Sequence, residues 1–162
     1  MSFLLWLEST GFGTFVRESE SMLGYPTFVT LHTIGMAIIV GISSVVALRL
    51  TGFAPTIPLA PLKRLFPIMW FGFAVNLFSG TGLAVAAATT TIPNPLFITK
   101  MTCVLSAVAI MAVLQVKVFR DPEIDDKPVS KRNKTLAALM LGLWLVGMIS
   151  GRLIGYTDQI FQ

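Results

Sequence analysis

The sequence predicts an all-α fold, an integral membrane four-helix bundle with an N-terminal interfacial helix. Hydrophobic residues make up 54% of the 162 residues and charged residues only 12%, and the mean hydropathy is +0.79. A water-soluble domain needs a more polar surface than this composition provides. Four apolar stretches approach the roughly 20 residues that a helix needs to cross the hydrocarbon core. Because lipid offers backbone groups no hydrogen-bond partners, such stretches form helices.

We expect residues 1–162 to form a single transmembrane domain that opens with an interfacial segment over residues 1–20. Apolar and aromatic side chains alternate there with charged ones, which suits a helix lying at the membrane surface. A flexible tail is the alternative, and composition does not separate the two. The apolar side chains are Phe3, Leu4, Trp6, Leu7, Phe12 and Phe15, and the charged ones are Glu8, Arg17, Glu18 and Glu20.

Four predicted spans follow along the chain, at about residues 26–50, 66–89, 96–119 and 136–156. Proline and glycine separate them, because both disfavour a continuous helix. The first connection contains GFAPTIPLAP, and TTTIPNP ends the second span and begins the third. The third connection, RDPEIDDKPVSKRNK, mixes acidic and basic residues, and Pro122 and Pro128 keep it from continuing either neighbouring helix.

Lysine and arginine are distributed unevenly over the connections. Of the 12 such residues, Arg17, Lys100 and Arg152 belong to the side of the two termini. The others belong to the first and third connections, and they are Arg49, Lys63, Arg64, Lys117, Arg120, Lys127, Lys131, Arg132 and Lys134. Cytoplasmic loops carry the excess of these cations, so we expect both termini on the outer side. The positive charge therefore reflects membrane orientation, and nucleic acid is not an expected partner.

Three ionisable side chains inside the apolar spans, His32, Lys100 and Arg152, are the strongest functional lead. They lie about six, four and four residues inside the outer ends of their helices. At a rise of about 1.5 Å per residue, these positions are at nearly one depth in the outer leaflet. A charged side chain at the centre of a span costs roughly 2.5 to 3.5 kcal/mol on insertion scales, so such groups usually face protein or water.

Simpler interpretations exist for each of the three residues. Lys100 and Arg152 are shallow enough to reach the interface as anchors, and His32 can be a neutral core residue bonded to a carbonyl. Glu18 and Glu20 lie in the adjacent external segment, so the cations can also form a closed ion-pair network with them. In the remaining interpretation, the cations receive an anionic group from a ligand.

Small residues recur at spacing four on the second and fourth spans. Such stripes let helices pack closely, either within the chain or between copies of it. Asn76, near mid-membrane, is expected to make an interhelical hydrogen bond. The single cysteine, Cys103, excludes an intrachain disulfide and is expected to be a packing residue. The stripes are Gly72, Asn76, Gly80, Ala84 and Ala88, and Gly147, Gly151 and Gly155.

Recognisable motifs occupy nearly the whole chain. After an external segment that contains ES, they are YPTFVTLHTIGMAIIVG, FPIMWFGFAVNLFSGTGL, NPLFITKM and WLVGMISGRLIGY. Their order resembles an uncharacterised family of small four-helix bacterial inner-membrane proteins. The same segments are similar to a reduced copper-resistance D type of membrane domain and, more loosely, to four-helix b-type cytochromes. The resemblance implies a bacterial inner membrane, with both termini then periplasmic, and it implies no firm activity.

The first functional hypothesis is an accessory or cofactor-holding subunit with a periplasm-facing polar site that binds haem b for electron transfer. His32 would supply an axial nitrogen, while Arg152 and Lys100 would hold the propionates. With one histidine in the chain, a single copy cannot provide bis-histidine ligation. The second ligand would be Met148, Met22 or the His32 of a second copy, or the iron would be five-coordinate.

Copper handling and a structural role are the alternatives. Copper would use His32 with Met22, Met36 and either Met101 or Met148, because imidazole and thioether ligands favour Cu(I), although the neighbouring cations repel a metal ion. A structural subunit would hold no cofactor and would pack as a homo-oligomer or within a larger membrane complex. A channel or carrier would need oligomerisation to form a pore. The absence of a phosphate loop, nucleophile elbow and HExxH motif argues against stand-alone catalysis.

Overall fold

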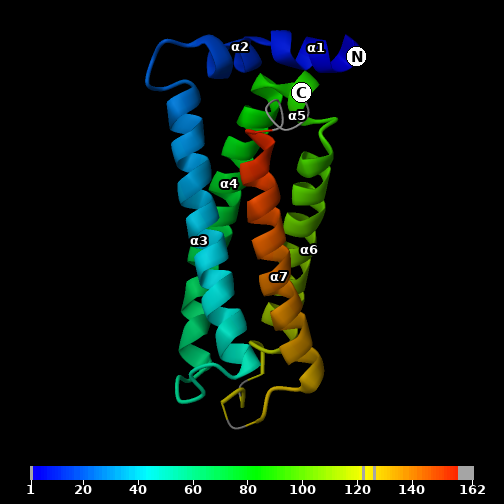
Figure 1. The fold of residues 1–162 in the computed structure, drawn as a ribbon. Coiled ribbons are helices and arrows are strands. Elements are labelled where there is room, and N and C mark those ends of the chain that lie inside the picture. The colour runs from blue at the N-terminus through cyan, green and yellow to red at the C-terminus, as the bar shows by residue number, and fades with distance from the viewer. Residues whose placement is uncertain (1, 122, 126, 157–162) are drawn as a thin grey trace.

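The computed structural model describes residues 2–121, 123–125 and 127–156, and it confirms the all-α fold (Figure 1). Pro122, expected to keep the third connection from continuing a neighbouring helix, lies outside these ranges. Four helices are long and apolar enough to cross a membrane, and they run side by side. They are α3 (Tyr25–Thr51), α4 (Phe66–Ala86), α6 (Pro95–Lys117) and α7 (Lys131–Ile154).

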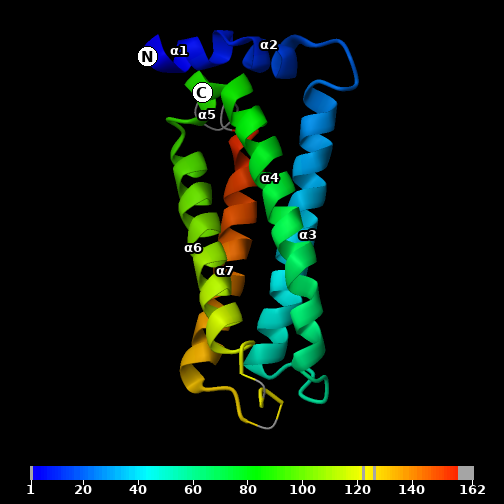
Figure 2. The ribbon, with the colours of Figure 1, turned by 180° about the vertical axis from the view of Figure 1, so that it is seen from behind.

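Short helices lie at the two ends of this bundle. Helices α1 (Ser2–Ser9) and α2 (Gly11–Glu18) lie across one end, and α5 (Ala88–Thr91) lies beneath them (Figures 1 and 2). The 3-10 helix η1 (Ala60–Leu65) belongs to the connection between α3 and α4. This connection and the one between α6 and α7 share the opposite end of the bundle. The first and third connections therefore lie on one side, as a four-span topology requires.

Hydrogen bonds join these two connections. The Asp125 carboxylate accepts from the backbone N–H groups of Leu59 and Ala60. Lys63 Nζ donates to the carbonyl oxygen of Asp121 at 3.4 Å. The third connection is therefore attached to the first, although its composition is typical of a solvated linker.

Two helix ends differ from the predicted spans by three residues or more. Helix α7 begins at Lys131, before the predicted residue 136, because the Ser130 hydroxyl caps it by accepting from Asn133 N at 3.3 Å. Helix α4 ends at Ala86, before the predicted residue 89, because Ala87 leaves the helical region with φ −137 and ψ 45. The apolar stretches located the helices, whereas capping and backbone conformation set their ends.

The N-terminal helices are attached to the bundle by polar contacts. Glu8 Oε1 accepts from Thr89 N at 2.8 Å and from Thr89 Oγ1 at 2.7 Å. Arg17 Nη1 donates to the Ala86 carbonyl oxygen at 3.2 Å, and this carbonyl belongs to the last turn of α4, where a helix lacks intrahelical partners. The segment is therefore ordered against the bundle rather than unattached.

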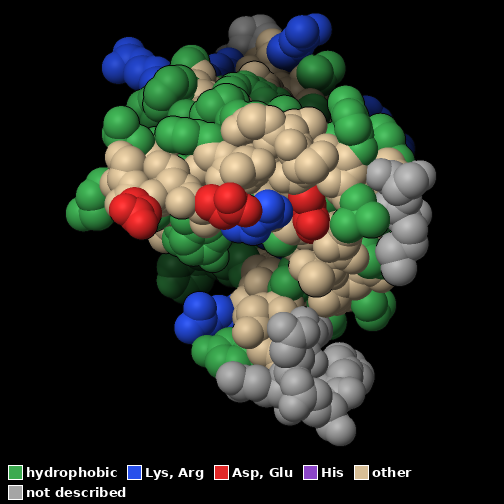
Figure 3. Space-filling model, turned by 90° about the horizontal axis from the view of Figure 1, so that it is seen from above, with side chains coloured by type: hydrophobic (Ala, Val, Ile, Leu, Met, Phe, Trp, Pro, Cys, Tyr) green, Lys and Arg blue, Asp and Glu red, His purple; other side chains and the backbone are tan. Residues whose placement is uncertain are grey.

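Apolar side chains of these helices remain exposed. Phe3 and Trp6 are 64% and 59% exposed, and their rings stack with centroids 5.8 Å apart. Seen from this end, acidic and basic groups lie among apolar side chains (Figure 3). A helix with an exposed aromatic surface next to charges suits the boundary between headgroups and acyl chains.

The attachment of α1 should depend on pH through Glu8. Hydrogen bonds from the side chain and backbone of Thr89, aided by the charge of Arg17, lower the pKa of Glu8. A carboxylate with a lowered folded-state pKa contributes stability above its unfolded pKa, about 4.3, and loses that contribution as the pH falls through the folded value. We expect peptic cleavage next to Trp6 to accelerate in that acidic range, and chymotryptic cleavage there to accelerate in Glu8→Gln already at pH 7.

Glu18→Gln is the matched control for this experiment. Glu18 pairs with Arg17 at 2.8 Å and is exposed, so its loss should leave α1 attached. Equal cleavage of the two variants at pH 7 would show that the Glu8 bonds do not hold α1.

The main hydrophobic core fills the half of the bundle away from α1 and α2. Helix α3 packs along α4, and α6 packs along α7, so the spans form two hairpins that meet mainly through α3 and α7. In this half, Trp70 Nε1 donates to Gln115 Oε1 at 2.9 Å and joins α4 to α6. Buried members of this core include Val46, Met69, Met111, Leu114, Met140 and Trp144. A smaller cluster of Val16, Phe28 and Ala86 lies beneath α2.

Gly72, Asn76 and Gly147 of the predicted small-residue stripes are buried, whereas Gly155 is exposed. A Cβ added at Gly35 would lie 2.7 Å from Asn76 N and 2.8 Å from Gly72 O, so the backbones of α3 and α4 are close together there. A Cβ at Gly147 would meet the Cys103 side chain at 3.4 Å, and Cys103 is a buried free thiol, which confirms its packing role. These residues of the stripes therefore serve packing within the chain.

Candidate functional site

His32 lies on α3, about two turns from the start of the helix, and is held by α4. Its Nδ1 donates to the Asn76 carbonyl oxygen at 3.2 Å, while Asn76 Nδ2 donates to the His32 carbonyl oxygen at 3.0 Å. The interhelical hydrogen bond predicted for Asn76 is confirmed. Because a carbonyl oxygen only accepts, Nδ1 carries the ring proton and Nε2 is left as an acceptor.

Lys100 approaches that acceptor from the other hairpin. Its Nζ lies 3.5 Å from His32 Nε2, so α3 and α6 meet through this pair. Both side chains are half-buried. Within the described ranges, every ion pair involves Arg17 or Lys127, and none supplies Lys100 with a carboxylate.

Two glycines make room for the pair. A Cβ at Gly80 would lie 2.8 Å from His32 Cε1, and a Cβ at Gly151 would lie 3.1 Å from Lys100 Cδ. The absent side chains therefore leave the space that the imidazole and the lysine stem occupy. Sequence reasoning placed these glycines in packing stripes but missed this role, because spacing alone does not show which side chain a glycine faces.

Arg152 lies at the edge of the site. It is exposed, its Nη2 donates to the Tyr156 hydroxyl at 3.2 Å, and its guanidinium lies 5.5 Å from the centroid of that ring. It nevertheless lines two cavities together with His32 and Lys100. The structure thus joins two of the three expected residues directly and places the third at the rim.

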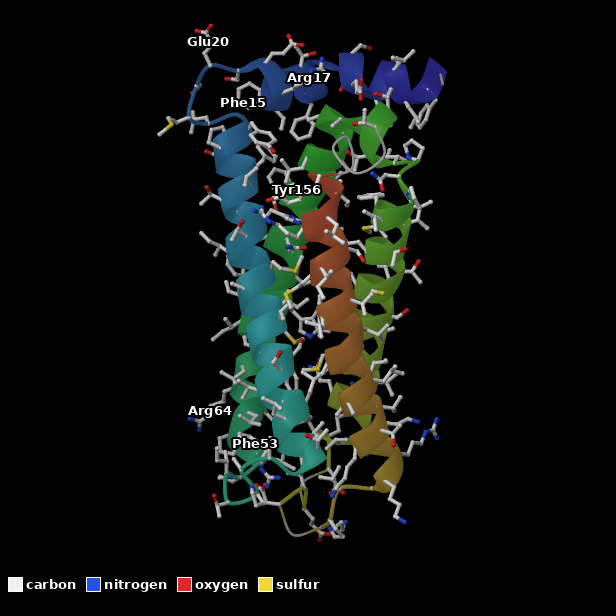
Figure 4. All side chains as sticks on the ribbon, viewed as in Figure 1. Phe15, Arg17, Glu20, Phe53, Arg64 and Tyr156 are labelled. Carbon is white, nitrogen blue, oxygen red and sulfur yellow. The ribbon has the colours of Figure 1, made fainter. Side chains whose placement is uncertain are left out.

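The carboxylates of the external segment do not reach these cations. Glu18 Oε1 pairs with Arg17 Nη2 at 2.8 Å. Glu20 is exposed and points away from the bundle (Figure 4). Tyr156, the partner of Arg152, lies instead at the C-terminal end of α7. In the part of the chain that the structure describes, Glu18 and Glu20 form no ion pair with Lys100 or Arg152, and the closed network expected as an alternative is absent.

Three cavities meet at the pair, and His32 and Lys100 line all of them. One of about 250 Å³ lies between α4 and α6 and has a mainly apolar lining. Another of about 480 Å³ lies between α3 and α7. The third, of about 430 Å³, lies at the end of the bundle that carries α1 and α2 and reaches α5. That half of the bundle is therefore hollow around the polar pair, whereas the other half contains the main core.

The methionines named as possible ligands are dispersed around these cavities. Met36 lines both lateral cavities, Met101 lines the one between α4 and α6, and Met148 lines the one between α3 and α7. Met22 is 80% exposed, outside the bundle. Among the described residues, no group of three His, Cys, Asp or Glu side chains could hold a metal ion. Lys100 also occupies the position from which a cation would approach His32 Nε2.

No protein-family model, curated protein or solved structure matches this chain. The resemblance to small bacterial inner-membrane proteins therefore stays a prediction. A histidine acceptor, a lysine from another helix and an arginine at the rim line the same two cavities, whose other walls are mainly apolar.

Proposed function

We propose that the protein is a ligand-holding subunit of a bacterial inner membrane, in which the His32–Lys100 pair binds the anionic group of a membrane-soluble molecule. The carrying observation is that Lys100 lines three cavities while no described carboxylate pairs with it. A cation inside a span costs free energy, and an anionic ligand would offset that cost. Arg152, at the rim of two cavities, would add a forked donor.

The proposed site faces the periplasm. It lies at the end of the bundle that carries α1 and α2, away from the connections that hold most of the lysines and arginines. An excess of cations marks the cytoplasmic side, so the site would lie in the outer leaflet with both termini periplasmic. Assembly as a homo-oligomer or with a larger membrane complex stays a prediction beside this proposal.

Haem b is the second candidate, and the hydrogen bond from His32 Nδ1 to a carbonyl favours it. Metal-ligating histidines commonly donate their other ring N–H in this way, and Nε2 would be free for the metal once Lys100 turned from it toward a propionate. Lys100 and Arg152 would hold the propionates, and Met148 lines a cavity with His32. When bound, haem would supply one-electron transfer. Copper has less support, because two cations line the same cavities.

Lys100→Gln should remove the bound ligand. We expect protein purified in a mild detergent to release an anionic molecule on extraction, measured by mass spectrometry. A hydrogen bond to a charged group contributes about 1.5 to 3 kcal/mol, so the variant should retain about tenfold less of that molecule. Lys117→Gln, an exposed position on the same helix, is the control and should retain it fully.

Absorption spectra of the same preparations decide between the two candidates. A Soret band in the reduced-minus-oxidised spectrum that disappears in His32→Ala would establish haem. A colourless preparation that still carries an anionic molecule would reject haem and keep the broader proposal. Equal retention by wild type and Lys100→Gln, or no anionic molecule in either, would refute the proposal and favour the structural-subunit hypothesis.

A further inference from the structure

We infer that the ligand is an anionic glycerophospholipid of the outer leaflet, with its headgroup on the His32–Lys100 pair and an acyl chain between α4 and α6. This inference rests on the proposed function, because it names the ligand class of the same site. Three features carry it: the lining of the cavity between α4 and α6, the side on which that cavity opens, and its continuity with the outer-end cavity.

The cavity between α4 and α6 is polar at one point and apolar elsewhere. Lys100 and His32 provide the polar point, with Asn76 beside them, and the rest of the lining includes Phe73, Phe97 and Val104. A small soluble anion would occupy only the polar point and leave the apolar lining without a partner. Because ligand sites match apolar walls to apolar ligand surface, this lining indicates an amphiphile with a hydrocarbon chain.

The same cavity reaches the lipid-facing surface of the bundle. Leu77 on α4 and Leu105 on α6 line it, yet they are 53% and 56% exposed. These two helices belong to different hairpins and make few contacts in the described ranges; Figure 2 shows them on one face of the bundle. The Trp70–Gln115 hydrogen bond joins them only in the core half. An acyl chain can therefore enter this cavity laterally from the membrane.

The outer-end cavity is suited to the headgroup. It shares His32, Lys100 and Ala84 with the cavity between α4 and α6 and adds Arg152 and Thr33. Lys100 and Arg152 are two cationic side chains on the lining of one cavity, and this suits a phosphate. Helices α1 and α2 lie across this end of the bundle. A lipid whose acyl chain stays in the membrane therefore reaches the cavity more directly between the helices than from the periplasm.

Ala84→Phe tests the inference by filling the shared part of the two cavities. Ala84 is half-buried on α4, whereas Ala74 on the same helix is exposed and lines none of the three cavities. Ala74→Phe is therefore the matched control. Each variant is reconstituted in nanodiscs of phosphatidylglycerol and phosphatidylcholine, re-extracted, and analysed by native mass spectrometry. We expect Ala84→Phe to retain about tenfold less phosphatidylglycerol than Ala74→Phe.

The outcomes separate this inference from the proposed function. Equal retention of phosphatidylglycerol by the two alanine variants overturns the lipid assignment. So does a wild-type protein that retains as much phosphatidylcholine as phosphatidylglycerol. Binding of glycerol phosphate without any retained lipid identifies a soluble anion instead and also overturns it. In both cases, loss of the bound anion in Lys100→Gln keeps the proposed function. Should Ala84→Phe fail to fold, Val85→Trp, at another half-buried position of the cavity between α4 and α6, provides the same comparison.

Discussion

Lys100→Met is expected to raise the free energy of unfolding while abolishing ligand retention. The lysine ammonium is half-buried and lines cavities in the half of the bundle that carries α1 and α2, and its described partner is the neutral acceptor of His32. Replacing a buried ion pair by apolar side chains of similar volume often gains about 1 to 4 kcal/mol, and a cation without a carboxylate partner has no ion-pair attraction to lose. Lys100 lies within two turns of the start of α6, so we expect a gain of about 1 to 2 kcal/mol, below the cost at the bilayer centre.

The measurement is denaturant unfolding of ligand-free protein in detergent, with Lys117→Met as control. Lys117 is exposed at the opposite end of the same helix, so its substitution should change stability little. Added anionic ligand should stabilise the wild type and not Lys100→Met, because a ligand stabilises only the state that binds it. A variant destabilised by more than about 1 kcal/mol would instead mean that the bond to His32 supports the fold, as the structural-subunit hypothesis holds.

The four spans and the depth of the polar residues were predictable because both follow from one-dimensional quantities. Apolar length defines a span, and rise per residue converts position into depth. The direction in which a side chain points around the helix axis depends instead on how the neighbouring helices pack. Lys100 and Arg152 illustrate the difference. Lys100 reaches across to α3, whereas Arg152 turns to Tyr156, four residues further along the sequence and just beyond the end of α7.

Contacts between distant polar groups were also beyond sequence reasoning. Glu8 and Thr89 are 81 residues apart, and no local pattern pairs a surface glutamate with the end of a remote helix. Trp70 and Gln115 are separated by 45 residues. Gln115 lies inside a predicted span, but no sequence pattern indicates which residue it bonds. Such bonds depend on how the hairpins dock, and docking is decided by side-chain packing over whole helix faces.

Gly35→Ala is expected to lower the free energy of unfolding by about 1 to 3 kcal/mol, the usual range for overpacking. The added methyl would meet backbone atoms of α4, Asn76 N at 2.7 Å and Gly72 O at 2.8 Å. Backbone atoms cannot move aside alone, so α3 and α4 must separate. The reciprocal bonds between His32 and Asn76 lie less than one turn along α3, so the separation should also displace the imidazole and weaken ligand retention.

Gly41→Ala provides the comparison on the same helix. A Cβ there meets nothing within 4 Å, and alanine favours a helix over glycine by up to about 1 kcal/mol, so this variant should be as stable as the wild type or more stable. Stability from denaturant unfolding and ligand retention are measured on both variants. If Gly35→Ala matched Gly41→Ala in both quantities, the close approach of α3 to α4 would not be what positions His32, and the site would have to be held from the α6 side through Lys100.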